Sequence, residues 1–293
     1  MKQRSSVFRK SFSTGLRQWR ITAIVYLFQL CLAFTLGMQV FDVLKASIGH
    51  SLELNKLLVH YDHTVFTDFL KIHGVSITPL IGQLRWLLLT WLIFSVFING
   101  GLLYAAYTPG YVAPGVFWRG ATSYFFPFGK ISLLFLFMAL VWSALIWIPA
   151  LIFLEPSLEY FSSEKYTIVL VISLLLIYLI GIVILFLWSV VSRALHIHAS
   201  ILMIRCIRDA WKNLWKNRTA FSGLISGFIG LNLLLLAVYW LMEAYTGMIS
   251  VPMILLVFVV QQAFVFFRIQ MRQMLYAGIV EITIRSNDSS MLR

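Results

Sequence analysis

The chain has 293 residues, of which 60% are hydrophobic and only 12% are charged. Soluble domains carry about 25% charged residues, so this composition excludes an ordinary soluble enzyme and predicts a multi-spanning membrane protein. The formal net charge of +12 would suggest a nucleic-acid partner in a soluble protein, but its placement along the chain favours a membrane topology instead.

The first 20 residues combine a basic face with an apolar face when they are wound as a helix. Their aromatic and aliphatic residues, from Phe8 to Trp19, share one side, whereas the basic residues lie away from it. This pattern is typical of a helix that lies in a membrane surface. A first apolar span follows at about residues 21–44, with Gln29 as a polar interruption.

Residues 45–84 form the longest polar segment, and their moderate hydrophobicity predicts short amphipathic helices that cap the bundle on its outer side. Within this segment, His60, Asp62 and His63 could bring two imidazoles and a carboxylate onto one helical turn. Zinc requires three or four such ligands in a fixed geometry. We therefore expect a solvated outer segment and no metal site.

The second span is expected at residues 86–107 and contains Asn99. A second basic, amphipathic segment begins near Phe117, after a stretch in which prolines and glycines break the helix. The third span is expected at residues 131–154 and the fourth at 167–191.

The most regular basic segment runs from Ile204 to Arg218. One of its faces is aromatic and aliphatic, and another carries four basic residues: Arg205, Arg208, Lys212 and Lys216. We expect a third elbow helix on the inner face of the membrane, where these four residues bind anionic lipid headgroups. The fifth span follows at residues 221–245 and contains Asn232.

The last span, at about residues 253–272, carries the candidate binding site. Gln261, Arg268 and Arg272 lie along one face, because offsets of 7 and 11 residues return to the same side of a helix. Such a stripe should face the bundle interior or a water-filled cavity and would bind an anionic group, such as a lipid phosphate, near the inner leaflet. Alternatively, both arginines reach the headgroups and Gln261 bonds to a neighbouring helix.

Four further polar residues lie within the spans: Gln29, Asn99, Asn232 and Gln262. They could line a pathway together with Gln261, or they could join helices by hydrogen bonds. No carboxylate lies deep in a span, and the sequence has no phosphate-binding loop, zinc-protease motif or nucleophile elbow. We therefore expect neither an enzyme nor a cofactor.

Charge placement predicts the orientation. With the N-terminus inside, the inner segments hold 18 of the 23 Lys and Arg residues, and the outer segments hold 8 of the 11 acids. The prediction is one all-α membrane domain over residues 1–293, with six transmembrane helices, three basic amphipathic elbow helices on the inner face and both termini inside. The net charge then reflects topology and attraction to anionic headgroups, with no nucleic-acid partner.

A resemblance to a known group is carried by four segments: FRKSFSTGLRQWR, FWRGATSYFFPFGKI, IRDAWKNLWKNR and VVQQAFVFFRIQMRQMLYAG. In these segments the chain resembles six-helix bacterial membrane proteins related to the membrane domain found fused to glycerophosphodiester phosphodiesterases. The resemblance implies a fold and a location in the bacterial cytoplasmic membrane. It transfers no activity, because the sequence contains no phosphodiesterase catalytic domain.

The leading hypothesis is a non-catalytic inner-membrane protein that binds anionic lipids through its basic elbows and scaffolds a protein partner or a lipid-facing cavity. The alternative is a transporter or channel subunit for a small or amphipathic solute, with Gln261, Asn99, Asn232 and Arg268 along its path. A continuous polar cavity would favour transport, whereas a packed bundle with exposed basic elbows would favour scaffolding.

Overall fold

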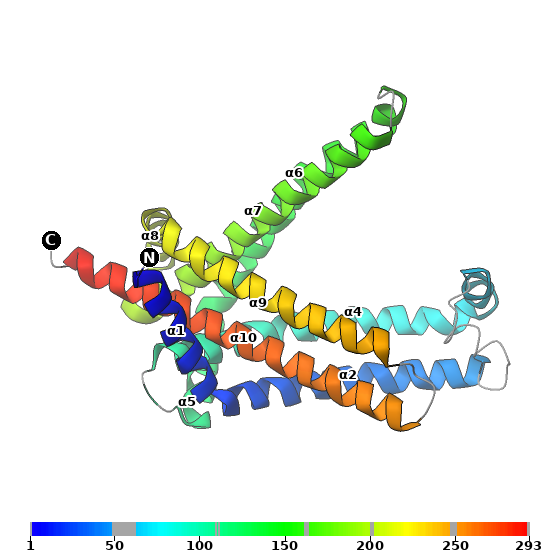
Figure 1. Cartoon of the computed structure of the whole chain (residues 1–293), viewed down its shortest axis with the longest axis horizontal. Helices are drawn as coiled ribbons and strands as arrows, with labels where there is room; N and C mark the ends of the chain where they lie inside the picture. The colour runs from blue at the N-terminus through cyan, green and yellow to red at the C-terminus, as the bar shows by residue number, and fades with distance from the viewer. Residues whose placement is uncertain are drawn as a thin grey trace. The chain divides into compact units, whose positions relative to one another are not determined.

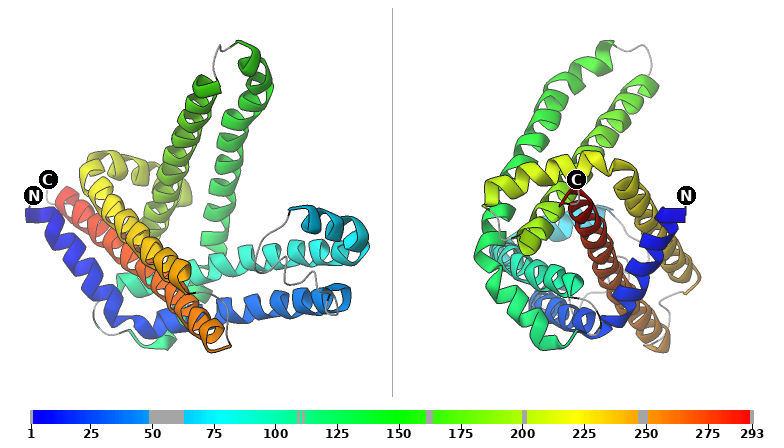
Figure 2. Two further views of the ribbon diagram at one scale, coloured as in Figure 1. Left: turned by 45° about the vertical axis from the view of Figure 1, so that its right-hand side comes forward. Right: turned by 90° about the vertical axis from the view of Figure 1, so that its left-hand side faces the viewer.

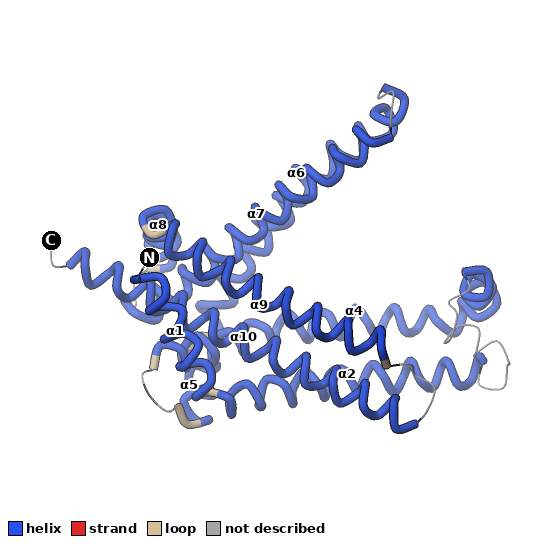
Figure 3. Tube along the Cα trace, in the orientation of Figure 1, coloured by secondary structure: helices blue, strands red, loops and turns tan. Residues whose placement is uncertain are grey.

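The computed structural model of the chain describes residues 2–48, 63–108, 110, 112–160, 164–199, 202–246 and 251–291. These residues form nine helices and no strand (Figures 1 and 3). Six are long and apolar enough to cross a membrane, which confirms the prediction of a helical multi-pass membrane protein. They are α2 (Trp19–Ile48), α4 (His63–Tyr107), α6 (Phe125–Tyr160), α7 (Glu164–Ala199), α9 (Arg218–Tyr245) and α10 (Val251–Met291).

All six helices extend beyond the spans that the sequence predicts, and α4 and α10 do so by the largest margins. Helix α4 begins at His63, so part of the segment expected to form separate capping helices is continuous with the second span. Helix α10 continues to Met291, well beyond the expected end at Arg272. Apolarity marks where a helix can meet lipid and does not mark where its backbone hydrogen bonds end.

The chain forms two compact units. One contains Ala23–Ser95, which is most of α2 and the first part of α4. These two helices pack on each other there, and the ring centroids of Phe28 and Phe94 lie 4.3 Å apart. The other unit contains Met1–Thr22 and Val96–Arg293, and it holds every site described below.

Each basic segment forms a short helix of its own, and one residue separates it from the long helix that follows. The short helices are α1 (Lys2–Arg17), α5 (Pro114–Ser123) and α8 (Met203–Lys216), and the separating residues are Gln18, Tyr124 and Asn217. Tyr124 (φ −101°, ψ 6°) and Asn217 (φ −109°, ψ 24°) have nearly the same backbone conformation. The carbonyl of Asn217 accepts from the N–H of Phe221 at 3.1 Å, so one residue ends α8 and starts α9.

Helix α10 is the central element of its unit, because it packs against α1, α7 and α9 (Figure 2). Its second half is buried on almost every side, and Tyr276 is among the most buried large side chains. Gly278 permits the closest approach: a Cβ atom there would lie 2.7 Å from Ser11 Oγ of α1 and 2.8 Å from the Leu224 methyl groups of α9. By contrast, most of the span in α7 is exposed and apolar, as expected of a helix that faces lipid.

Helices α4 and α5 approach equally closely. A Cβ atom on Gly101 would lie 2.4 Å from the ring of Phe117 and 2.9 Å from its backbone oxygen. Phe117 is only 1% exposed. The three short helices pack on different neighbours: α1 on α10 and α9, α5 on the last turns of α4, and α8 on α7 and α9.

Candidate functional site

Helix α8 has three faces, whereas the sequence predicts two. The buried face consists of Cys206, Ala210, Asn213 and Leu214. The exposed apolar face consists of Ile204, Trp211 and Trp215. The exposed basic face consists of Arg205, Arg208, Lys212 and Lys216. At 3.6 residues per turn, the centres of the two exposed faces lie roughly 85° apart around the helix axis, and the buried face lies roughly 140° from each of them.

The buried face of α8 is held against α7. Trp188 of α7 donates from Nε1 to the carbonyl of Ile207 at 2.8 Å, and its ring lies 4.7 Å from that of Trp211. Cys206 Sγ lies 3.8 Å from His196 Nδ1. Burial, with a smaller contribution from Asp209, raises the pKa of the Cys206 thiol. This thiol is therefore mostly protonated at neutral pH and is a weak nucleophile.

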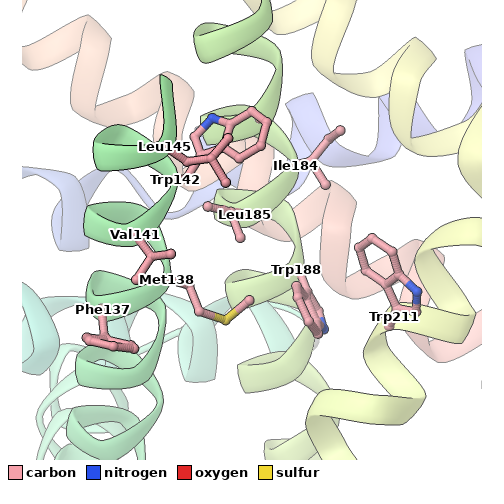
Figure 4. Close-up of a pocket in the computed structure, with 10 residues that line it drawn as sticks. Phe137, Met138, Val141, Trp142, Leu145, Ile184, Leu185, Trp188 and Trp211 are labelled. Atoms are coloured by element: carbon pink, nitrogen blue, oxygen red, sulfur yellow. The ribbon is translucent and has the colours of Figure 1, made fainter. Parts of the chain in front are cut away.

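An apolar groove of about 400 Å³ lies between α6 and α7 and reaches α8 (Figure 4). Its walls include Val141 and Leu145 of α6 and Leu185 of α7, and the indoles of Trp188 and Trp211 lie at its α8 end. A volume of this size is within the range of ligand pockets in proteins. Because the groove has almost no polar lining, it can hold only an apolar group.

A second constellation joins α4 to α10 inside the bundle. Asn99 of α4 accepts two hydrogen bonds at Oδ1, one from Nη2 of Arg272 and one from the hydroxyl of Tyr276, which lies 2.8 Å away. Arg272 also donates from Nε to the Tyr276 hydroxyl at 3.1 Å. Its guanidinium carbon lies 5.4 Å from the centroid of the Tyr276 ring. These three side chains form a connected network around a positive charge.

Arg193 of α7 is a further buried cation of this unit. It is 8% exposed, and its Nη2 donates to Ser132 Oγ of α6 at 3.1 Å. The guanidinium carbon lies 5.9 Å from the centroid of the Phe128 ring. The Nε atom of Arg193 is buried and has no hydrogen-bond partner.

Glutamines anchor the first elbow to α4 and α10. Gln18 is 1% exposed, donates from Nε2 to the carbonyl of Ala105 at 2.9 Å and accepts from Nε2 of Gln273. Gln270 of α10 donates to the carbonyl of Gly15. Asn217 makes the corresponding contact at the third elbow, where its Nδ2 donates to Ser286 Oγ at 2.9 Å.

The structure separates the residues of the predicted stripe on the last span. Arg272 lies in the bundle and bonds to Asn99, whereas Gln261 and Arg268 are exposed. Asn232 bonds to the carbonyl of Phe228 in its own helix at 2.8 Å. Gln29 and Gln262 are partly buried. Among the candidates within the spans, Asn99 and Arg272 bond to each other.

Sequence reasoning missed five residues of these constellations: Gln18, Arg193, Gln270, Gln273 and Tyr276. Gln18 and Arg193 lie at the edges of spans, where polar residues are ordinarily attributed to the membrane surface. The other three lie after Phe267, where α10 continues beyond its apolar part. The polar residues of that stretch were the signal that could have identified them.

The described residues contain no group of three or more His, Cys, Asp or Glu side chains that could hold a metal ion. His60 and Asp62 lie outside the described residues, as does the side chain of His63. No protein-family model, curated protein or solved structure matches the chain.

Proposed function

We propose that this chain is a non-catalytic, lipid-interacting protein of a bacterial inner membrane, with both termini inside and the three short helices on the inner face. The basic face of α8 binds anionic lipid headgroups, and the bundle scaffolds a protein partner. The observation that carries this proposal is that the basic and apolar outer faces of α8 are both exposed while the third face packs on α7. In such a helix the apolar outer face can contact acyl chains while the basic face contacts the lipid headgroups.

The contacts of the short helices support the proposal that all three lie on the same side of the membrane. Lys10 of α1 lies 2.8 Å from both carboxylate oxygens of Glu281 near the end of α10, and Asn217 after α8 bonds to Ser286 on the same helix. Helix α5 packs against the end of α4, which Gln18 also contacts. The proposed fold is that of the bacterial six-helix proteins that the four quoted segments resemble.

The groove beside α8 supports one particular lipid position. Trp211 lines the groove, and Arg208 and Lys212 are its exposed basic neighbours on α8. We infer that one acyl chain of an anionic phospholipid occupies the groove while its phosphate meets these two side chains. Arginine and lysine bind phosphate by charge-assisted hydrogen bonds, and the tryptophan rings lie where an acyl chain meets a headgroup.

Removing the basic face tests headgroup binding. The variant Arg205→Gln/Arg208→Gln/Lys212→Gln/Lys216→Gln should bind anionic phospholipid on the order of 1,000-fold more weakly, because each basic side chain near an anionic surface contributes about 1 kcal/mol. Native mass spectrometry of the detergent-purified protein titrated with phosphatidylglycerol measures this binding.

The matched control removes four exposed cations that we expect on the outer side: Lys45→Gln/Lys71→Gln/Arg85→Gln/Lys165→Gln. It has the same net charge as the test variant and should retain the binding of the unmodified protein. Equal loss of binding in both variants would attribute the effect to net charge and remove the support for α8.

Filling the groove tests the acyl-chain position. Val141→Trp places an indole in the groove, whereas Leu140→Trp changes an exposed residue that does not line it. Lost packing of about 1 kcal/mol should weaken the binding of long-chain phosphatidylglycerol about fivefold in Val141→Trp alone. A short-chain analogue should bind both variants alike. If Leu140→Trp weakened binding as much as Val141→Trp, the lipid would lie elsewhere.

The transport alternative has less support. Asn99 and Asn232 bond to different partners, and Gln261 and Arg268 are exposed. The pocket described above is apolar rather than a polar path.

A further inference from the structure

The apolar groove between α6 and α7 has an indole at each end (Figure 4). At the α8 end, the ring of Trp188 lies 5.2 Å from that of Phe135 on α6 and 4.7 Å from that of Trp211 on α8. The N–H of Trp188 is bonded to the carbonyl of Ile207 at 2.8 Å. This end of the groove therefore presents aromatic carbon and no free indole N–H of Trp188.

The other end of the groove lies where Trp142 of α6 meets α7. The indole covers Gly181, because a Cβ atom on this glycine would overlap it. Its Nε1 donates to the carbonyl of Tyr178 at 3.3 Å. The α7 residues that line the groove run from Gly181 to Trp188. Trp142 thus spans from one helix to the other at the level where the lining on α7 stops.

The two ends of the groove are equally far apart on both helices. Phe135 and Trp142 are seven residues apart on α6, and Gly181 and Trp188 are seven residues apart on α7. Seven residues of helix rise by about 10 Å. An extended chain advances by about 1.2 Å per bond, so this length accommodates about nine carbon–carbon bonds.

We propose that the groove holds about the first ten carbons of one acyl chain and that Trp142 ends it. This inference rests on the lipid position proposed above, in which the phosphate meets the basic face of α8. Carbons up to the level of Trp142 gain contacts with both helices, whereas later carbons pass the indole and meet only other lipids. The preferred ligand is then an anionic phospholipid whose chains have about ten carbons or more.

The experiment compares phosphatidylglycerols that differ only in the length of their saturated chains: hexanoyl, octanoyl, decanoyl, dodecanoyl and hexadecanoyl. Each competes with one reference phosphatidylglycerol at equal mole fraction in the same detergent micelles. Native mass spectrometry of the full-length protein gives the ratio of the two bound lipids. Because both lipids report on the same folded molecules, this ratio does not depend on how much of a variant has folded.

The variants Trp142→Ala and Trp142→Leu remove the proposed end of the groove. Trp147→Ala is the matched control, since Trp147 also packs on Tyr178, with ring centroids 5.6 Å apart, but does not line the groove. Phosphatidylcholines of the same chain lengths provide the comparison without net charge.

We expect the affinity of the unmodified protein and of Trp147→Ala to rise on the order of tenfold from hexanoyl to decanoyl chains and then to level off. In Trp142→Ala the rise should continue to dodecanoyl chains and beyond, because the groove is then open at this end. Trp142→Leu should level off at an intermediate length.

A steady rise through hexadecanoyl chains in the unmodified protein would overturn the inference, since lipids that merely surround the protein have no such end. Levelling at the same length in the Trp142 variants and the unmodified protein would overturn it as well. Failure of the proposed lipid position gives a different result: phosphatidylglycerol would then bind no more tightly than phosphatidylcholine at any chain length, and the inference would fall with it.

Discussion

Gly101→Leu is expected to destabilise the unit that contains it by about 3 kcal/mol, because α4 and α5 have no room for a side chain at this position. A Cβ atom alone would lie 2.4 Å from the ring of Phe117 and 2.9 Å from its backbone oxygen. The ring cannot move aside readily, since Phe117 is only 1% exposed. The unfolding midpoint of the purified protein, followed by loss of the monodisperse peak on heating, measures the effect.

Gly230→Leu is the matched control, because a Cβ atom on this exposed residue of α9 would meet no atom within 4 Å. Glycine is also the poorer helix former, so Gly230→Leu should leave the midpoint unchanged or raise it slightly. A normal midpoint for Gly101→Leu would mean that α5 packs against α4 less closely than the structure shows.

Gln18→Leu should cost about 2 kcal/mol of stability, because it removes hydrogen bonds from buried polar groups of two other helices. The carbonyl of Ala105 loses its donor, and the amide of Gln273 loses the acceptor Gln18 Oε1. The same thermal assay should therefore show a lower midpoint for Gln18→Leu and for Gln273→Leu.

The double variant Gln18→Leu/Gln273→Leu separates this explanation from a simple loss of packing. Replacing both partners of a buried pair by apolar groups of similar shape is less costly than orphaning one of them. The double variant should thus be less destabilised than the sum of the single variants. Strict additivity would show that the two glutamines do not act as a pair.

The sequence predicts the six long helices because lipid-facing segments must be apolar over a membrane thickness, and this requirement leaves a clear pattern. It does not predict which polar residue faces which neighbour. Arg268 and Arg272 are separated by only about 40° around the helix axis. Yet Arg268 is exposed, whereas Arg272 is half-buried and bonds to Asn99 of α4. Helical periodicity gives the direction of a side chain and does not say which element lies in that direction.

Helix α8 illustrates the same difficulty for apolar residues. Ile204 is 81% exposed, whereas Ala210 is fully buried. In a membrane protein both lipid and protein interior are apolar, so hydrophobicity cannot distinguish a lipid-facing isoleucine from a buried one. Small residues such as Cys206 and Ala210 are buried because they allow α8 to approach α7 closely. This criterion depends on the partner helix as much as on the residue.

The single residues that separate each short helix from the long helix after it also constrain where residues can be inserted or deleted. One extra residue beside Gln18, Tyr124 or Asn217 would turn the preceding short helix by about 100° relative to the helix that follows. The anchoring side chain and the outward faces would then point in new directions. Insertions and deletions should therefore be far less acceptable at these separating residues than in ordinary loops. The separating residues fix the rotation of each short helix about its own axis as well as the direction of the chain.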